Sequence, residues 1–433
     1  MQNPVAFIKK LLKKGYRKAM RSIAFYPVIV SLSLFSLAII TLNLENWNFV
    51  IDIKKSNPYL FIEDTETART ILSTLIAGII TLTVFSFTMV MVVLNQAASN
   101  FSPRLLPGLV SNKRHQLILG FYIGTLLYST VILISLGAYD LENNTVGMST
   151  TLAAVLGISC VGLFVSFIHN ISSAVQIQNI VESIYRRSKD TLEHYFQKEL
   201  TEITPLKFVG DDDYKLIASN KEGYFQGFDI HLLDAAIFNT DLQLVVVPYT
   251  CEHIWNGSPL FKTSRSLTKE EEAALLFACI VSKDLHDGNH PLLGLIKLME
   301  IGVRAMSPGI NDPGTALDVV HKLGPLLAQM IRLPAYTSNY DMKRSLVVVK
   351  TNISTSMLLS TIVQPIRLYA KKDSSLMTAL IKTFDYLKLS HGISEEDKEA
   401  IAQEQIALEE DIAKFITNKK DKQRILGLLA DLG

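Results

Sequence analysis

The feature that most constrains this chain is a set of four long apolar stretches, all of which lie before residue 180. They run from about residue 24 to 42, 70 to 94, 116 to 138 and 149 to 168. A helix that rises about 1.5 Å per residue crosses a hydrocarbon core of about 30 Å within such a length. The sequence therefore predicts four transmembrane helices, which form a transmembrane domain over residues 24–178.

The rest of the chain has the composition of a water-soluble domain. Hydrophobic residues make up 48% of the sequence and charged residues only 19%, but the apolar excess falls before residue 180. The remainder is long enough to bury a core of its own. The basic residues concentrate beside the membrane stretches, so we expect no nucleic-acid partner. The cysteines are too far apart for a disulfide framework or a cysteine-rich zinc site: Cys160, Cys251 and Cys279.

The charges of the loops predict the orientation in the membrane. The loop between the second and third stretches carries Arg104, Lys113 and Arg114 and no acid. The loop between the third and fourth stretches carries Asp140 and Glu142 and no base. Because basic loops stay inside, we expect a multi-pass protein of the bacterial inner (cytoplasmic) membrane with both termini in the cytoplasm.

The first 23 residues form a basic segment. They contain seven Lys or Arg residues and no acid, interleaved with apolar residues. This pattern predicts an amphipathic helix that lies on the membrane surface, with membrane lipids, including anionic lipid, as its partners. The apolar stretch that follows is longer than the core of a secretory signal peptide, so we expect the segment to remain in the mature protein.

The soluble part divides into three predicted segments. Residues 179–200 keep apolar residues at spacings of 3–4, which predicts a helical stalk. Residues 201–265 form a small mixed α/β segment, in which GYFQGF and LQLVVVPY are strands around a helix DIHLLDAAIFNT. Residues 266–433 are mainly helical, with one strand at 345–350. The predicted fold class is a membrane protein of four transmembrane α-helices followed by a cytoplasmic α+β domain, mostly helical with a small β subdomain.

Several short blocks resemble one bacterial protein family. AMSPGINDPGTA (305–316) resembles an ALSPGINDP-type signature, and NFSPRLL, FIHNISSAVQ, GYFQGFD and IWNGSPL resemble other blocks of that family in the same order. The family is one of predicted membrane proteins, domain of unknown function 2254. The resemblance covers nearly the whole chain and implies an architecture without an activity. The chain departs from the family at Asn289-His290-Pro291, where the family has Gln-Asp-Pro.

The second apolar stretch carries a polar stripe. Four polar residues recur every seven positions and therefore share one helix face: Thr74, Thr81, Thr88 and Asn95. Such a face lines a water-filled pore when several subunits surround an axis, because it avoids lipid. The alternative is tight helix packing with hydrogen bonds between helices or to the backbone.

The third and fourth stretches carry small residues at helical spacing. Gly120 and Gly124 in the third, and Ser159, Gly162 and Ser166 in the fourth, favour close helix packing. No ionisable residue lies deep within any stretch, which argues against proton-coupled transport.

One titratable side chain, His169, lies at the cytoplasmic end of the fourth stretch. It is a candidate for sensing pH or binding an ion, because histidine titrates near neutral pH. The alternative, which we favour, is a structural histidine whose ring is held by hydrogen bonds.

The segment 305–316 predicts a rigid elbow between two helices. Its prolines and glycines end one helix and start another, with Asp312 or Thr315 as the cap and Gly309 as a candidate for positive φ. The alternative is a ligand or cation site. The candidate residues for either role are Ser307, Pro308, Asn311, Asp312 and Pro313.

A loop upstream of the elbow contains four possible metal ligands: Asp284, His286, Asp287 and His290. Imidazole and carboxylate suit Zn²⁺, but the spacing matches no fixed metal motif, so a surface loop without metal is favoured. The sequence contains no phosphate-binding loop, nucleophile elbow or dinucleotide fingerprint, and we expect no cofactor.

These patterns favour an oligomeric membrane protein that forms an ion or small-solute pathway. The cytoplasmic domain would gate the pathway or assemble the subunits, so we expect further copies of the chain as partners in a homo-oligomer. The alternative is a non-conducting membrane-anchored sensor or scaffold. A third interpretation, a membrane-bound enzyme, depends on the Asp/His loop.

Overall fold

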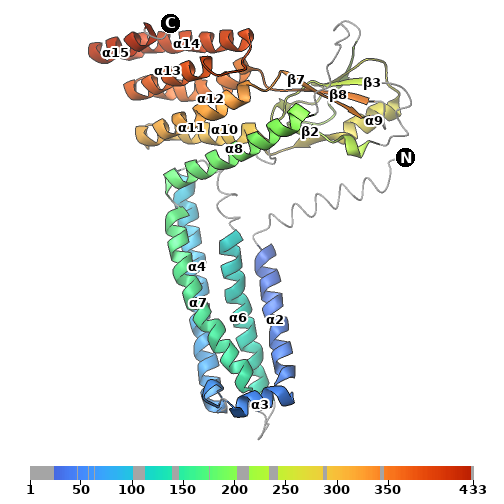
Figure 1. The fold of residues 1–433 in the computed structure, drawn as a ribbon, viewed down its shortest axis with the longest axis vertical. Coiled ribbons are helices and arrows are strands. Elements are labelled where there is room, and N and C mark those ends of the chain that lie inside the picture. The colour runs from blue at the N-terminus through green and yellow to red at the C-terminus, as the bar shows by residue number, and fades with distance from the viewer. Residues whose placement is uncertain are drawn as a thin grey trace. The chain divides into compact units, whose positions relative to one another are not determined.

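The computed structural model describes residues 24–45, 47–56, 58–62, 64–100, 113–138, 146–174, 176–201, 214–233, 242–285, 290–341 and 346–430. The chain divides into two compact units, one up to Gln176 and one from Ile177 onward (Figure 1). We call them the membrane unit and the C-terminal unit. The predicted residues 1–23 lie outside the described part of the chain.

Within its described residues, the membrane unit contains four helices that are long and apolar enough to cross a membrane. They are α2 (Phe25–Leu44), α4 (Thr65–Asn100), α6 (Lys113–Ala138) and α7 (Gly147–Ala174). Short helices α3 (Asn48–Ser56) and η1 (Pro58–Leu60) lie between α2 and α4. The predicted fold class is confirmed, since these helices precede a mostly helical unit with a few strands.

Helix α6 is the centre of the membrane unit and packs against α2, α4 and α7. Its contact with α2 depends on two glycines. A Cβ at Gly120 would lie 2.8 Å from the Cα of Pro27, and a Cβ at Gly124 would lie 2.6 Å from Cδ1 of Leu34. The predicted close packing at these two glycines is confirmed. On the other side of α6, the aromatic ring of Tyr122 is buried in an apolar cluster.

The C-terminal unit has two small sheets. The five-stranded sheet has the order β1 (Lys215–Ala218), β5 (Pro259–Thr263), β3 (Leu242–Val246), β8 (Leu346–Thr351) and β7 (Tyr336–Asp341). Its β3 and β8 are parallel, and its other pairs are antiparallel. The antiparallel three-stranded sheet has the order β4 (His253–Ile254), β2 (Gly223–Phe228) and β6 (Cys279–Ser282). A shared core forms around Phe261, Leu244 and Leu275.

Three predicted strands are β2, β3 and β8, but one predicted helix differs. Of the helix predicted over 229–240, the structure describes a 3₁₀ turn, η4 (Ile230–Leu232), and residues 234–240 lie outside its described ranges. Helix α9 (Lys269–Ala278) ends earlier than predicted, and Cys279–Ser282 is a strand. The helix ends early because of a tertiary contact. The β-branched residues of Cys279–Ser282 pair with strand β2, as Val281 does with Phe225.

Seven helices complete the C-terminal unit and stack in layers (Figure 1). They are α8 (Ile177–Thr201), α10 (Pro291–Ala305), α11 (Pro313–Ile331), α12 (Thr355–Ala370), α13 (Ser374–Lys388), α14 (Glu395–Phe415) and α15 (Lys419–Ala430). Helix α8 was predicted to be a stalk, but it packs against α10 and α11. Lys322 of α11 binds Glu182 of α8 at 2.6 Å. Helix α8 is therefore an integral layer of this unit.

The glycine contact on α6 yields a stability prediction. Gly120→Ala places a methyl group against the backbone of Pro27, which has no flexible side-chain atom to move aside. We expect a loss of about 1–3 kcal/mol in the free energy of unfolding and a lower melting temperature in detergent. Gly137→Ala, on the same helix with nothing within 4 Å, is the matched control and should melt like the unmodified protein. Equal melting of both variants would contradict the packing.

Candidate functional site

The polar stripe of α4 lies on the face that the rest of the membrane unit leaves uncovered. Thr74, Thr81, Thr88 and Asn95 are all exposed. The opposite face of α4, which includes Leu72, is buried. The stripe therefore makes no close packing with the described helices, and its surroundings are lipid or another molecule.

The hydroxyls of this stripe donate to their own helix. Thr74 donates to the carbonyl of Thr70 at 2.8 Å and Thr88 to the carbonyl of Val84 at 2.9 Å. Thr81 bonds the backbone four residues earlier in the same way, at 2.9 Å. Each hydroxyl oxygen keeps lone-pair capacity to accept a further hydrogen bond. The stripe thus presents acceptors to whatever lies on that face.

The small residues of α7 also point away from the described helices. Ser159, Gly162 and Ser166 are exposed, and a Cβ at Gly162 would meet nothing within 4 Å. The predicted close packing of this stripe involves no described helix of the same chain, and packing against another molecule stays a prediction. Helix α7 instead contacts α4 through Gly157, where a Cβ would lie 2.5 Å from Cδ2 of Leu75. His169 is exposed near the end of α7, and its sensing role stays a prediction.

Four hydroxyls are enclosed in the centre of the bundle, where Ser86 lies beside Tyr122, Thr125 lies beside the Cys160 thiol, and Ser129 has no hydrogen-bond partner among the described residues. They belong to Ser86 of α4 and to Tyr122, Thr125 and Ser129 of α6, each at most 3% exposed. An unsatisfied buried hydroxyl costs about 1–3 kcal/mol. The sequence held a signal for this group, because Tyr122, Thr125 and Ser129 follow the 3–4 spacing of the buried face of α6.

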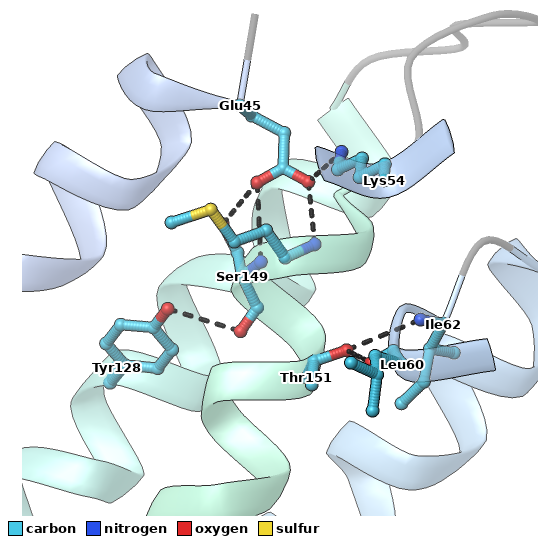
Figure 2. Close-up of polar contacts among 8 residues, drawn as sticks. Glu45, Lys54, Leu60, Ile62, Tyr128, Ser149 and Thr151 are labelled. Carbon is cyan, nitrogen blue, oxygen red and sulfur yellow. Dashed lines mark hydrogen bonds and ion pairs between the residues drawn. The ribbon is translucent and has the colours of Figure 1, made fainter. Parts of the chain in front are cut away.

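A polar network closes one end of the membrane unit (Figure 2). The Glu45 carboxylate accepts a hydrogen bond from Lys54 at 2.5 Å, and both side chains are buried. The same carboxylate accepts from the backbone N–H of Met148 at 2.9 Å and from the hydroxyl of Ser149 at 3.0 Å. Because these groups begin α7, Glu45 acts as a remote cap that compensates the free N–H groups of a helix start.

Two further contacts join the same end of the bundle. The Tyr128 hydroxyl shares a hydrogen bond with the Thr41 hydroxyl at 3.0 Å and donates to the Ser149 carbonyl at 3.2 Å. The Thr151 hydroxyl donates to the Leu60 carbonyl at 3.1 Å (Figure 2). Helices α2, α3, α6 and α7 and the η1 turn are therefore tied together here. No periodic pattern marks this network in the sequence, because Glu45 and Lys54 lie in the link between two apolar stretches.

The elbow at 305–316 forms a tight turn between α10 and α11. The Asp312 carboxylate accepts from the Thr315 hydroxyl at 2.6 Å and from the Thr315 N–H at 3.1 Å, so Asp312 is the predicted cap. These hydrogen bonds to Thr315 hold the pKa of Asp312 below its ordinary value. The positive φ falls on Asn311, at 47°, and not on Gly309 as expected. Asparagine tolerates this conformation better than most residues.

The other candidate residues of the elbow lie at the end of α10, in the turn, or at the start of α11. The Ser307 hydroxyl donates to the Arg304 carbonyl at 2.6 Å and closes the end of α10. Pro313 begins α11, and Pro308 is exposed in the turn. These contacts account for a rigid elbow without any ligand, and a ligand role for the segment stays a prediction.

The predicted metal loop is only partly described. His286 and Asp287 lie outside the described residues, and Asp284 is exposed. His290 caps α10 by accepting from the Leu292 N–H at 3.3 Å, and its ring packs edge-on against Tyr195. Burial lowers the pKa of His290 to about 4, so its imidazole is neutral at neutral pH. Across the ranges that the structure describes, no three His, Cys, Asp or Glu side chains are grouped to hold a metal.

The sequence was also compared with known proteins. The family described as "Predicted membrane protein (DUF2254)" matches residues 20–386. An uncharacterized protein of Mycobacterium bovis is 23% identical over 375 residues, which cover 84% of this chain and 71% of that protein. Two uncharacterized proteins of Mycobacterium tuberculosis match over the same length with the same identity. No solved structure matches the chain.

The buried pair Glu45 and Lys54 yields a second prediction. Glu45→Gln leaves the Lys54 ammonium buried without its carboxylate and weakens the cap of α7. We expect the free energy of unfolding to fall by about 3–5 kcal/mol. Lys54→Met should also lower the melting temperature in detergent, whereas Lys55→Met, at the exposed neighbouring position, should not. If Lys54→Met and Lys55→Met melted alike, the buried pair would not hold this end of the bundle.

Proposed function

We propose, from the premise that the chain belongs to the predicted membrane protein family DUF2254, that several copies surround an ion or small-solute pathway lined by α4. The membrane would be the bacterial inner membrane, with both termini in the cytoplasm, as the loop charges predict. The predicted family resemblance is confirmed. The role of 305–316 as a signature of that family stays a prediction.

One observation supports the proposal: the polar stripe of α4 lies on the uncovered side of the helix, beside exposed apolar residues such as Phe87. Thr74, Thr81, Thr88 and Asn95 are exposed, while the centre of the bundle is filled by apolar side chains and a few enclosed hydroxyls. A water-lined path therefore fits better between chains than inside one. A carboxamide such as that of Asn95 is costly to expose to lipid, and an aqueous axis removes that cost.

A second surface supports assembly. The exposed face of α7 contains Ser159, Gly162 and Ser166 at spacings of three and four residues, and small residues let helices of neighbouring chains approach closely. In this arrangement α7 of one chain would contact the next chain while α4 faces the axis. The C-terminal unit would assemble the chains or gate the path.

A non-conducting scaffold or sensor is the second candidate, and one observation favours it. Each threonine hydroxyl of the stripe already donates to its own helix backbone. Threonines bonded in this way can face lipid at little cost. The membrane unit would then only hold the C-terminal unit at the membrane.

Cysteine accessibility separates the two candidates. In vesicles that contain the full chain, cysteines in Thr81→Cys and Thr88→Cys should react with a charged methanethiosulfonate, because a thiol at an aqueous axis can ionise. The controls are Ile80→Cys and Phe87→Cys, whose parent side chains are 47% and 58% exposed. Each lies one residue before a stripe position, at nearly the same depth but about 100° around the helix. These controls should stay inert.

A measurement of ion flux through reconstituted vesicles is the second part of this test. The native cysteines Cys160, Cys251 and Cys279 are buried and set the background for the labelling. Thr81→Leu should lower ion flux through reconstituted vesicles, because a ring of leucines narrows and dries a path, whereas Ile80→Leu should not. Equal inertness at all four cysteine positions, together with no flux from the unmodified protein, would exclude the pathway and favour the scaffold.

A further inference from the structure

The C-terminal unit contains a cavity of about 420 Å³ between α8, α11 and the end of α13. This volume lies within the range of small-molecule sites. Helix α8 contributes Tyr185 and Lys189, and the last turns of α11 contribute Gln329 and Arg332. Tyr386 of α13 and His391 after it close the third side.

The charge of the cavity is one-sided. Lys189 and Arg332 are cationic, and none of the lining residues is an acid. Arg332 has no carboxylate partner within the described chain, and its guanidinium lies over the Phe196 ring at 5.7 Å. Lys189 has only a long contact with Glu193, at 3.9 Å. The cavity therefore offers an anion two cationic groups, the ammonium of Lys189 and the guanidinium of Arg332.

The loop after α13 is shaped to approach Arg332. Gly392 has a φ of +83°, which L side chains rarely adopt, and a Cβ there would lie 3.6 Å from Nε of Arg332. Glycine permits this left-handed backbone conformation directly after His391, which lines the cavity together with Arg332.

The other groups indicate what else a ligand carries. Gln329 lines the cavity, and its Oε1 is buried without a hydrogen-bond partner in the described structure. Two tyrosine rings, Tyr185 and Tyr386, line the same cavity. Lys322 lies over the Tyr185 ring at 5.3 Å and is itself bound to Glu182, which fixes that ring. Aromatic walls favour a planar ring.

We infer that this cavity binds a nucleotide, with its phosphate at Arg332 and Lys189 and its base against the tyrosines. Guanidinium and ammonium groups are the usual protein partners of phosphate. Anionic lipid headgroups and free phosphate share the phosphate chemistry but lack the ring. This inference goes beyond the membrane pathway and does not depend on it.

Calorimetric titration of the full chain in detergent micelles tests the inference. The probes are AMP, UMP, glycerol phosphate as a headgroup mimic, and inorganic phosphate. We expect saturable binding of at least one nucleotide, tighter than that of glycerol phosphate or phosphate and weaker at high salt. Absence of saturable binding of both nucleotides would overturn the inference. Tighter binding of glycerol phosphate than of either nucleotide would also overturn it, in favour of a lipid headgroup.

Four variants locate the binding. Arg332→Gln and Lys189→Gln should each weaken nucleotide binding about tenfold or more. Lys382→Gln, an exposed lysine of α13 outside the cavity, is the matched control and should bind normally. Tyr386→Leu should weaken nucleotide binding but leave phosphate binding unchanged.

Melting temperatures show that each variant is folded. If Arg332→Gln is unstable because it loses the Phe196 contact, Lys189→Gln and Arg332→Lys decide the outcome. Arg332→Lys should bind more weakly than the unmodified protein and more tightly than a folded Arg332→Gln. Unchanged nucleotide affinity in Lys189→Gln and in either folded Arg332 variant would place the ligand elsewhere and overturn the assignment.

Discussion

The membrane unit depends on one constraint, which is that hydrocarbon supplies no hydrogen bonds. Its polar groups meet this constraint in different ways. The exposed threonines of α4, such as Thr81, donate to their own backbone. The start of α7 is compensated by the Glu45 carboxylate, which is itself neutralised by Lys54. Where neither solution exists, as at Ser129, the hydroxyl is enclosed in the bundle centre without a partner among the described residues.

The close approach of α2 and α6 at Gly120 and Gly124 has consequences for the rest of the unit. It makes α6 the central helix and leaves α4 with only one covered face. The polar stripe of α4, which includes Thr81 and Thr88, lies on the uncovered face, so these side chains can interact only with what surrounds the bundle. The C-terminal unit has its own chemistry, in the basic and aromatic cavity beside Arg332. The proposed pathway in the membrane unit and the proposed nucleotide site in the C-terminal unit can therefore be tested independently.

Much of the fold could be predicted from the sequence, because long apolar stretches and the Val-rich segments of β3 and β8 are strong local signals. The role of Asp312 as a helix cap could also be predicted, because the prolines and glycines around it are a strong local signal for the start of a helix. The strand after α9 could not, since a short apolar run fits helix and strand equally well. The outward face of α7 was also not predictable, because a membrane helix is apolar on every side. The Glu45 and Lys54 pair joins residues nine apart through an irregular link, and no periodic pattern marks such a contact.

If copies of this chain place α4 around a common aqueous axis, a cryo-electron microscopy map of the full chain in lipid nanodiscs will show the arrangement. We expect a symmetric ring in which α4 is the helix nearest the axis, with Thr81 and Thr88 facing a centre free of lipid density. A monomer, or a ring whose centre is filled with lipid, would contradict it.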